Sequence, residues 1–247
     1  MKRVERHKLK ENDFARTVAQ ARDALETRRS EFGIMALVAA IVVAAALGFY
    51  WWRSSRNAAA DTMLASALAI YDAPVVPIAP PAPGSPPPVP QPGTYPTEQA
   101  KLQAALPKFV EAATAYPSTN QGIAARYHEA GILAGLGRFA EAEQQYQEVV
   151  NRAGQNSIYG RTARLGLADA QVAQGKYDNA INLYTELSRD TNSQIPVDSV
   201  LIQLGRAYAR AGRKDEAVRA FNRIVSEFPQ SLDAADALRE MEEVRKS

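Results

Sequence analysis

Hydrophobic and polar positions divide the chain into three parts. Residues 32–52, FGIMALVAAIVVAAALGFYWW, form an apolar run of 21 residues without a charge. Residues 73–96 break all periodicity, because they hold eleven of the chain's 15 prolines. From Thr97 onward, apolar residues recur three and four positions apart, as on one face of an α-helix. The pattern predicts an all-α protein with a single N-terminal transmembrane helix and a C-terminal helical domain.

The apolar run has the length of a membrane span. As a helix it is about 30 Å long, which matches the hydrocarbon core of a bilayer. Aromatic residues 50–52 stand at one end, where such rings prefer the headgroup layer. A buried core helix rarely runs this long without a polar residue. A cleaved signal peptide would use the small residues at 58–60, but Arg53 and Arg56 separate them from an apolar run that is already too long. We predict a transmembrane helix at residues 32–52.

Basic residues near this helix predict its orientation. Residues 1–31 carry nine Lys and Arg, whereas the other flank carries only Arg53 and Arg56 before Lys101. The positive-inside rule places residues 1–31, a charged segment, in the cytoplasm and everything after the helix on the opposite side. Residues 1–31 also contain one apolar helical face, formed by Phe14, Val18, Ala21 and Leu25. This face would dock on the membrane or a partner, or belong to a solvated helix that leads into the span.

Small residues recur every fourth position within the span, at Ala36, Ala40, Ala44 and Gly48. Such a stripe lets two membrane helices approach closely, so it is a candidate pairing surface. Alanine is also ordinary filler in a span this rich in it, and the sequence leaves both interpretations open.

Two segments connect the span to the C-terminal domain. Residues 53–72 are predicted as a juxtamembrane helix, with Leu64, Leu68 and Tyr71 on one face. Residues 73–96 are predicted as a Pro-rich linker, because proline lacks the amide donor and fits neither a helix nor a central strand. An extended polyproline-type spacer is expected, with a PxxP recognition motif as the alternative. The helical domain then covers residues 97–247.

A repeated turn organises this domain. Gly137, Gly175 and Gly212 each open a short polar segment that ends in alanine, with spacings of 38 and 37 residues. The alanines are Ala142, Ala180 and Ala217, and four residues after each comes Tyr146, Tyr184 or Phe221. The last unit adds Leu204, Gly205, Tyr208 and Pro229 in register, and an upstream fragment shows Ala105, Phe109, Ala112 and Pro117 at the matching offsets. These residues resemble the tetratricopeptide repeat, in which two helices pack around a small residue and an aromatic ring.

The resemblance implies a helical solenoid, because one such unit cannot bury its apolar face alone. Residues 57–72 would supply the first helix of the first repeat, with the Pro-rich run inserted after it. A final amphipathic helix is expected to cap the stack through Asp233, Ala234, Ala237, Leu238, Met241 and Val244. An unrelated helical bundle is the structural alternative.

Composition excludes most chemistry. The chain has no cysteine and two histidines, of which His7 is expected to be solvated and His128 to lie exposed or at the rim of a repeat. The part of the chain after the span has 20 basic and 21 acidic residues, so its net charge predicts no basic surface for nucleic acid. No nucleotide-binding, metalloprotease or serine-hydrolase motif is present. We expect no enzyme, no cofactor, no metal and no small-molecule substrate; pairs such as Glu141 and Glu143 are expected to be solvated.

The whole layout resembles bacterial single-span proteins of the YfgM type, the ancillary subunits of the SecYEG translocon, which share their repeat domain with the CpoB family. The resemblance implies a single-pass protein of the inner membrane whose repeats lie in the periplasm. It also implies partners at the SecYEG translocon or among periplasmic chaperones, and a role in assisting emerging envelope proteins. A structural scaffold for an envelope machine, in cell division or outer-membrane assembly, is the alternative.

The resemblance further implies a peptide groove lined by the first helix of each repeat. The residues expected there are Tyr127, Gly131, Ala134, Leu165, Asp169, Val172, Ile202, Arg206 and Ala209. Their mixed but mostly apolar character favours an apolar or unfolded segment as the ligand. The basic clamp that some family members use for acidic chain ends is missing.

Overall fold

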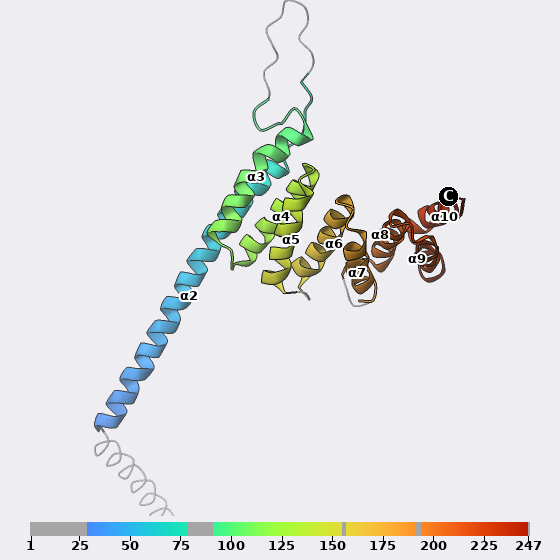
Figure 1. Cartoon of the computed structure of the whole chain (residues 1–247). Helices are drawn as coiled ribbons and strands as arrows, with labels where there is room; N and C mark the ends of the chain where they lie inside the picture. The colour runs from blue at the N-terminus through green and yellow to red at the C-terminus, as the bar shows by residue number, and fades with distance from the viewer. Residues whose placement is uncertain (1–28, 79–90, 155–156, 191–193, 247) are drawn as a thin grey trace, which may run out of the picture. The chain divides into compact units, whose positions relative to one another are not determined.

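The structure, a computed structural model, describes residues 29–78, 91–154, 157–190 and 194–246. Within these residues the chain is almost entirely α-helical (Figure 1). The helices are α2 (Arg29–Tyr71), α3 (Glu98–Ala115), α4 (Asn120–Gly135), α5 (Phe139–Ala153), α6 (Ile158–Ala173), α7 (Tyr177–Leu187), α8 (Val197–Arg210), α9 (Lys214–Glu227) and α10 (Asp233–Lys246). The amphipathic segment at residues 14–25 lies outside the described residues.

The chain forms two compact units, Met1–Ser55 and Arg56–Ser247. The first unit contains the apolar part of α2, where large side chains such as Ile41, Leu47 and Trp51 are more than half exposed. By length and composition alone, this helix can cross a membrane. The sequence predicts a span and a separate juxtamembrane helix, but α2 runs through both without a break. The reason is local: residues 53–62, RSSRNAAADT, contain neither proline nor glycine to end the helix.

The second unit begins with a helix pair. Ala60 and Ala67 of α2 are buried, and Ala67 packs in one cluster with Leu102 and Phe109 of α3. The Tyr71 ring meets the Phe109 ring edge-on at 6.0 Å. Residues 56–71 therefore supply the first helix of the first repeat, close to the predicted residues 57–72, so the folded domain includes this helix in addition to residues 97–247.

The ends of the Pro-rich segment lie side by side. The Val76 amide donates to the Tyr95 carbonyl at 2.8 Å, and the Tyr95 amide donates to the Pro74 carbonyl at 3.1 Å. The expectation of an extended spacer between two separate parts is therefore wrong for these ends. Packing of α2 on α3 overrides it, because the two helices bury their shared apolar face only when the ends of the connection meet.

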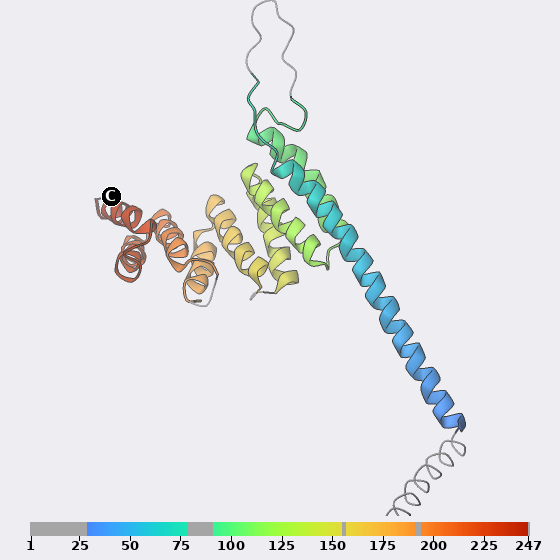
Figure 2. The same ribbon diagram turned by 180° about the vertical axis from the view of Figure 1, so that it is seen from behind.

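Three further repeats follow, and each turn has the geometry that its glycine predicts. Gly137, Gly175 and Gly212 have φ angles of 76°, 75° and 74°, in the left-handed region that other residues avoid. At each turn the amide after the glycine donates to a carbonyl five residues back, which closes the first helix. The pairs α4–α5, α6–α7 and α8–α9 result (Figures 1 and 2).

The small and aromatic residues of the repeat form its core. Ala142, Ala180 and Ala217 are completely buried, so no larger side chain fits where the paired helices cross. Tyr184 and Phe221 beside them are 1% and 0% exposed. Helix α10 packs on α8 and α9 through Ala234, Ala237 and Met241. Leu238, expected on the same buried face, is 45% exposed, because it lies on the outer side of this last helix.

Candidate functional site: a cleft between α6 and α8

Three of the predicted groove residues line one cleft. Asp169 and Val172 reach it from α6, and Arg206 reaches it from α8. The cleft has a volume of about 260 Å³. The rest of its lining consists of Ala173, Tyr184, Gln203, Ala207 and Arg210. First helices of neighbouring repeats thus form the cleft, as the resemblance implies.

The other predicted groove residues lie elsewhere. Tyr127 of α4 is half-buried, with its ring 5.9 Å from the rings of Tyr146 and Tyr159. Ala134 and Leu165 are partly buried and pack against the core. Ile202 is only 3% exposed and does not line the cleft, so it belongs to the core.

The burial of Ile202 has a physical reason in α10. This helix packs against α8, and a hydrogen bond of 3.1 Å joins the Ser199 hydroxyl to Asp233. The sequence analysis treats each first helix as equivalent. It therefore does not anticipate that the capping helix covers part of the last one.

A carboxylate is fixed at the centre of the cleft. Asp169 accepts a hydrogen bond from the Tyr184 hydroxyl. Asp169 reaches solvent, yet the surrounding protein atoms remove much of its hydration, which raises the pKa of this carboxyl. The Tyr184 hydrogen bond opposes that shift. Burial, together with the charge of Asp169, raises the pKa of Tyr184. The pair therefore holds the carboxylate in one orientation with the phenol as its donor.

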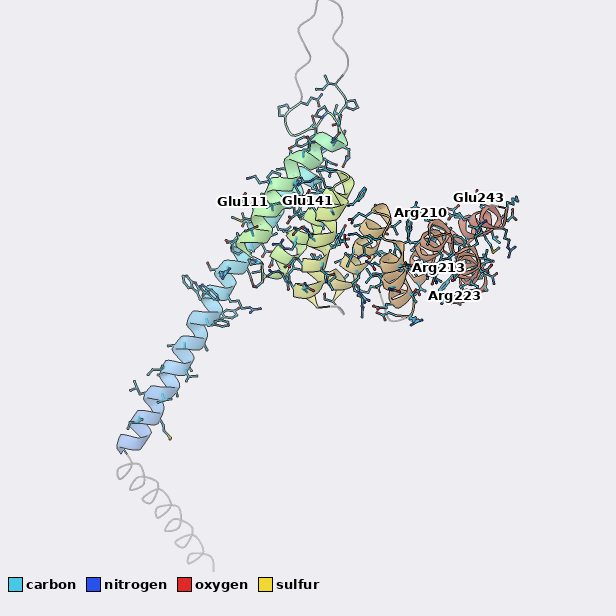
Figure 3. All side chains as sticks on the ribbon, in the orientation of Figure 1. Glu111, Glu141, Arg210, Arg213, Arg223 and Glu243 are labelled. Carbon is cyan, nitrogen blue, oxygen red and sulfur yellow. The ribbon has the colours of Figure 1, made fainter. Side chains whose placement is uncertain are left out.

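The two cleft arginines differ in their partners. Arg206 donates from Nε to both carboxylate oxygens of Glu240, at 2.9 and 3.1 Å, and so ties α8 to α10. Arg210 is exposed and makes no ion pair or hydrogen bond with any residue that the structure describes. Figure 3 labels Arg210 on α8. Arg210, rather than the predicted Arg206, is the cation available to a ligand.

Sequence reasoning missed Arg210, although a signal was present. Arg210 follows Arg206 by four residues, and residues four apart share a helical face. It lies in the last turn of α8, two residues before the turn glycine Gly212.

Outside the cleft, His128 is packed, which is one of its two expected settings, whereas Glu143 differs from expectation. His128 is half-buried, with its ring stacked on Phe109 at 5.2 Å, and burial lowers the pKa of this imidazole. Glu143, expected to be solvated, accepts hydrogen bonds from Gln171, Gln174 and Lys176 at 3.1, 2.8 and 2.6 Å. Glu143 thus joins two repeats, and both residues have structural roles.

The cleft offers recognition chemistry. It combines an oriented carboxylate, an unpaired guanidinium and the apolar walls of Val172, Ala173 and Ala207. No group of His, Asp and Glu able to hold a metal ion occurs among the residues that the structure describes. The arrangement suits a peptide with an acidic residue next to an aliphatic one.

Comparisons with known proteins agree with this fold. A family model described as tetratricopeptide repeat matches residues 165–231, which hold the last two glycine turns. The crystal structure of BtubC (BKLC) from P. vanneervenii is 18% identical and has a TM-score of 0.53, covering 60% of this chain and 67% of that one. A tetratricopeptide repeat protein from Parabacteroides merdae is 18% identical with a TM-score of 0.50, covering 60% and 56%.

No curated protein sequence matches the chain. The two structural relatives show the fold alone, since their sequences have diverged so far. Together with the repeat motifs, they show that the helical domain is built from tetratricopeptide repeats. Such repeats serve as protein-binding scaffolds, so the chain is a protein-interaction module.

Proposed function

We propose that the chain is a membrane-anchored binding module of the bacterial envelope, which holds segments of translocated or periplasmic proteins in the cleft between α6 and α8. The observation that carries the proposal is a cleft lined by the unpaired Arg210, the oriented Asp169 and apolar side chains. A polypeptide offers all three complements at once: a carboxylate, a backbone amide and an aliphatic side chain.

The apolar part of α2 supports the anchoring step. Its side chains are exposed in the chain itself, and burial in lipid would remove that large apolar surface from water. The excess of basic residues in residues 1–31 supports an N-terminus in the cytoplasm and repeats in the periplasm.

Photocrosslinking in living cells tests the binding step. A benzophenone amino acid replaces Gln203, which lines the cleft, and a matched control replaces Lys108 on the exposed side of α3. We expect position 203 to capture exported proteins, and Arg210→Glu to reduce the yield, because it would place a second negative charge near Asp169. Capture of cytosolic proteins only, or equal yield at both positions, would reject the proposal.

Protease protection tests the orientation. Protease added to spheroplasts should degrade the repeats and spare residues 1–31. Repeats that survive until the membrane is lysed would place them in the cytoplasm.

Crosslinking within the membrane tests the translocon as partner. A probe beside Ala40 should react with a subunit of SecYEG, and Leu at Ala40 and Ala44 should weaken that reaction, because close helix approach needs small side chains. Absence of any translocon crosslink, combined with septal localisation, would favour the scaffold alternative.

A further inference from the structure

A second cleft lies on the other side of α8. It has a volume of about 280 Å³ and is lined by residues of α7, α8 and α9. Its floor consists of Leu201, Leu204 and Ala220, of which only Leu204 and Ala220 keep any exposed surface, at 5% and 4%. The cleft therefore offers a pre-formed apolar floor that is separate from the site described above.

Arginines surround this floor. Arg189 and Arg219 line the cleft and are exposed, and their guanidinium groups make no ion pair or hydrogen bond with any residue in the described part of the chain. Arg223, beside them, donates to Glu227 at 2.8 Å. Figure 3 labels Arg223 on α9.

The one acidic residue of the lining does not neutralise these arginines. Glu216 accepts hydrogen bonds of 3.1 Å from Arg213. Arg213 also lies over the Tyr208 ring, with its guanidinium carbon 4.8 Å from the ring centroid. Arg219 also interacts electrostatically with Glu216, without a hydrogen bond between them, so the rim keeps an excess of positive charge, with three arginines and one glutamate in the lining.

The arginines are particular to this junction between repeats. The turn glycines set the register, because Arg219 follows Gly212 by the same interval that separates Asn182 from Gly175. In the preceding junction, the residues equivalent to Arg189, Arg219 and Arg223 are Asn151, Asn182 and Glu186. In the first junction they are Thr114, Gln144 and Glu148.

This comparison separates folding from function. Earlier repeats adopt the same helix pairs with neutral or acidic residues at these positions, so the fold does not require arginine there. The floor varies as well, because the residues equivalent to Leu201, Leu204 and Ala220 in the preceding repeat are Arg164, Leu167 and Leu183.

We propose that this second cleft docks an acidic segment of a partner protein. An aliphatic side chain of the segment packs on the floor, and two flanking carboxylates pair with Arg189 and Arg219. Charge complementarity carries this choice, because the planar guanidinium matches a carboxylate with paired hydrogen bonds. An apolar floor of this depth fits a side chain, whereas a lipid headgroup would use the arginines and leave the floor unfilled.

The proposal goes beyond the function proposed above, and the two can fail independently. The test uses the full chain in mild detergent and a fluorescein-labelled peptide, Glu-Glu-Leu-Glu-Glu. Binding is followed by fluorescence anisotropy. Two control peptides have Gln in place of each Glu, or Gly in place of Leu. We expect each control peptide to bind at least about tenfold more weakly than Glu-Glu-Leu-Glu-Glu, because one lacks the carboxylates and the other lacks the aliphatic side chain.

Variants locate the binding. Arg189→Asn with Arg219→Asn introduces the residue found at the equivalent positions of the preceding repeat, so the fold should persist. We expect this pair to weaken binding of the acidic peptide about tenfold or more. Lys108→Asn with Arg245→Asn changes the net charge equally at distant exposed positions and should leave binding unchanged.

Other outcomes would overturn the proposal. One is the absence of binding by the acidic peptide at millimolar concentration. Another is an equal loss of peptide binding in the charge-matched control, Lys108→Asn with Arg245→Asn. Loss on Arg210→Asn instead would assign the peptide to the cleft between α6 and α8. Co-flotation with phosphatidylglycerol vesicles that depends on Arg189 and Arg219, without peptide binding, would assign the arginines to a membrane surface.

Discussion

At the scale of single residues, Glu129 breaks the repeat pattern. It stands eight residues before Gly137, where the later repeats have Leu167 and Leu204 at the same distance from their glycines. Glu129 is 6% exposed, and its Oε2 has no hydrogen-bond partner among the described residues. The nearest cation, on Arg126, is 3.9 Å away. A buried, poorly paired carboxylate therefore occupies a position that the fold otherwise fills with leucine.

Glu129→Leu should stabilise the protein. An unsatisfied buried polar group typically costs about 1–3 kcal/mol, and leucine fits the same position in two sibling repeats. We expect a higher midpoint of thermal unfolding, measured by circular dichroism on the full chain in detergent. Leu167→Glu is the matched reverse change and should lower the midpoint. A lower midpoint for Glu129→Leu would show that Glu129 has a partner that stabilises the fold.

Stability should also depend on pH through Glu129. Burial raises the pKa of this carboxyl in the folded chain above its ordinary 4.5, while Arg126 opposes the shift. The folded state then holds the proton more tightly, so the contribution is favourable at low pH and is lost as pH rises above about 4.5. The advantage of Glu129→Gln over the wild type should therefore grow as pH rises, in parallel thermal melts. A gap that stays constant with pH would contradict the raised pKa.

At the scale of helices, replacing either of two glycines with alanine is expected to have opposite effects on stability. Both Gly131 of α4 and Gly205 of α8 lie inside helices, where alanine is favoured by about 1 kcal/mol. A Cβ on Gly205 would lie 2.3 Å from the ring of Phe221, which is completely buried. A Cβ on Gly131 would meet only the Tyr146 hydroxyl oxygen at 3.6 Å, an ordinary contact.

Gly205→Ala should therefore destabilise the protein, because overpacking typically costs about 1–3 kcal/mol and exceeds the gain in helix propensity. Gly131→Ala, the matched control, should stabilise it by up to about 1 kcal/mol. Chemical unfolding monitored at 222 nm measures both. Equal effects of the two changes would mean that α8 and α9 do not cross as closely as described.

Contacts between helices also decide how much of the cleft between α6 and α8 can be predicted from the sequence. Repeat register places Asp169, Val172 and Arg206 at one cleft, because positions in a repeat map directly onto helix faces. It fails for Ile202, which is buried in a core cluster that also contains residues of α10. It also cannot assign partners, so the pairing of Arg206 with Glu240, which leaves Arg210 unpaired, appears only once the helices are packed.

At the scale of the whole molecule, the Pro-rich segment connects α2 to α3. Composition predicts a polyproline spacer, because proline excludes helix. The resemblance to the tetratricopeptide repeat, rather than composition, predicts that the segment is inserted after residues 57–72 within one repeat, and the packing of α2 with α3 agrees with that prediction. The segment is thus an insertion within a repeat, with its ends joined by hydrogen bonds between Val76 and Tyr95 and between Tyr95 and Pro74.

Replacing residues 79–90 with four glycines should therefore leave the repeats folded. The hydrogen bonds at Val76 and Tyr95 already hold the ends together, at 2.8 Å between amide and carbonyl. Closing a shorter loop loses less chain entropy, by about 0.6 kcal/mol for each halving of length, so stability should stay equal or rise slightly. A Gly-Ser segment of the original length is the control, because it removes the prolines without shortening the loop. Thermal melts of both variants measure the effect. If the four-glycine variant unfolds earlier while the control does not, the segment must span a real distance, and the pairing of α2 with α3 would be wrong.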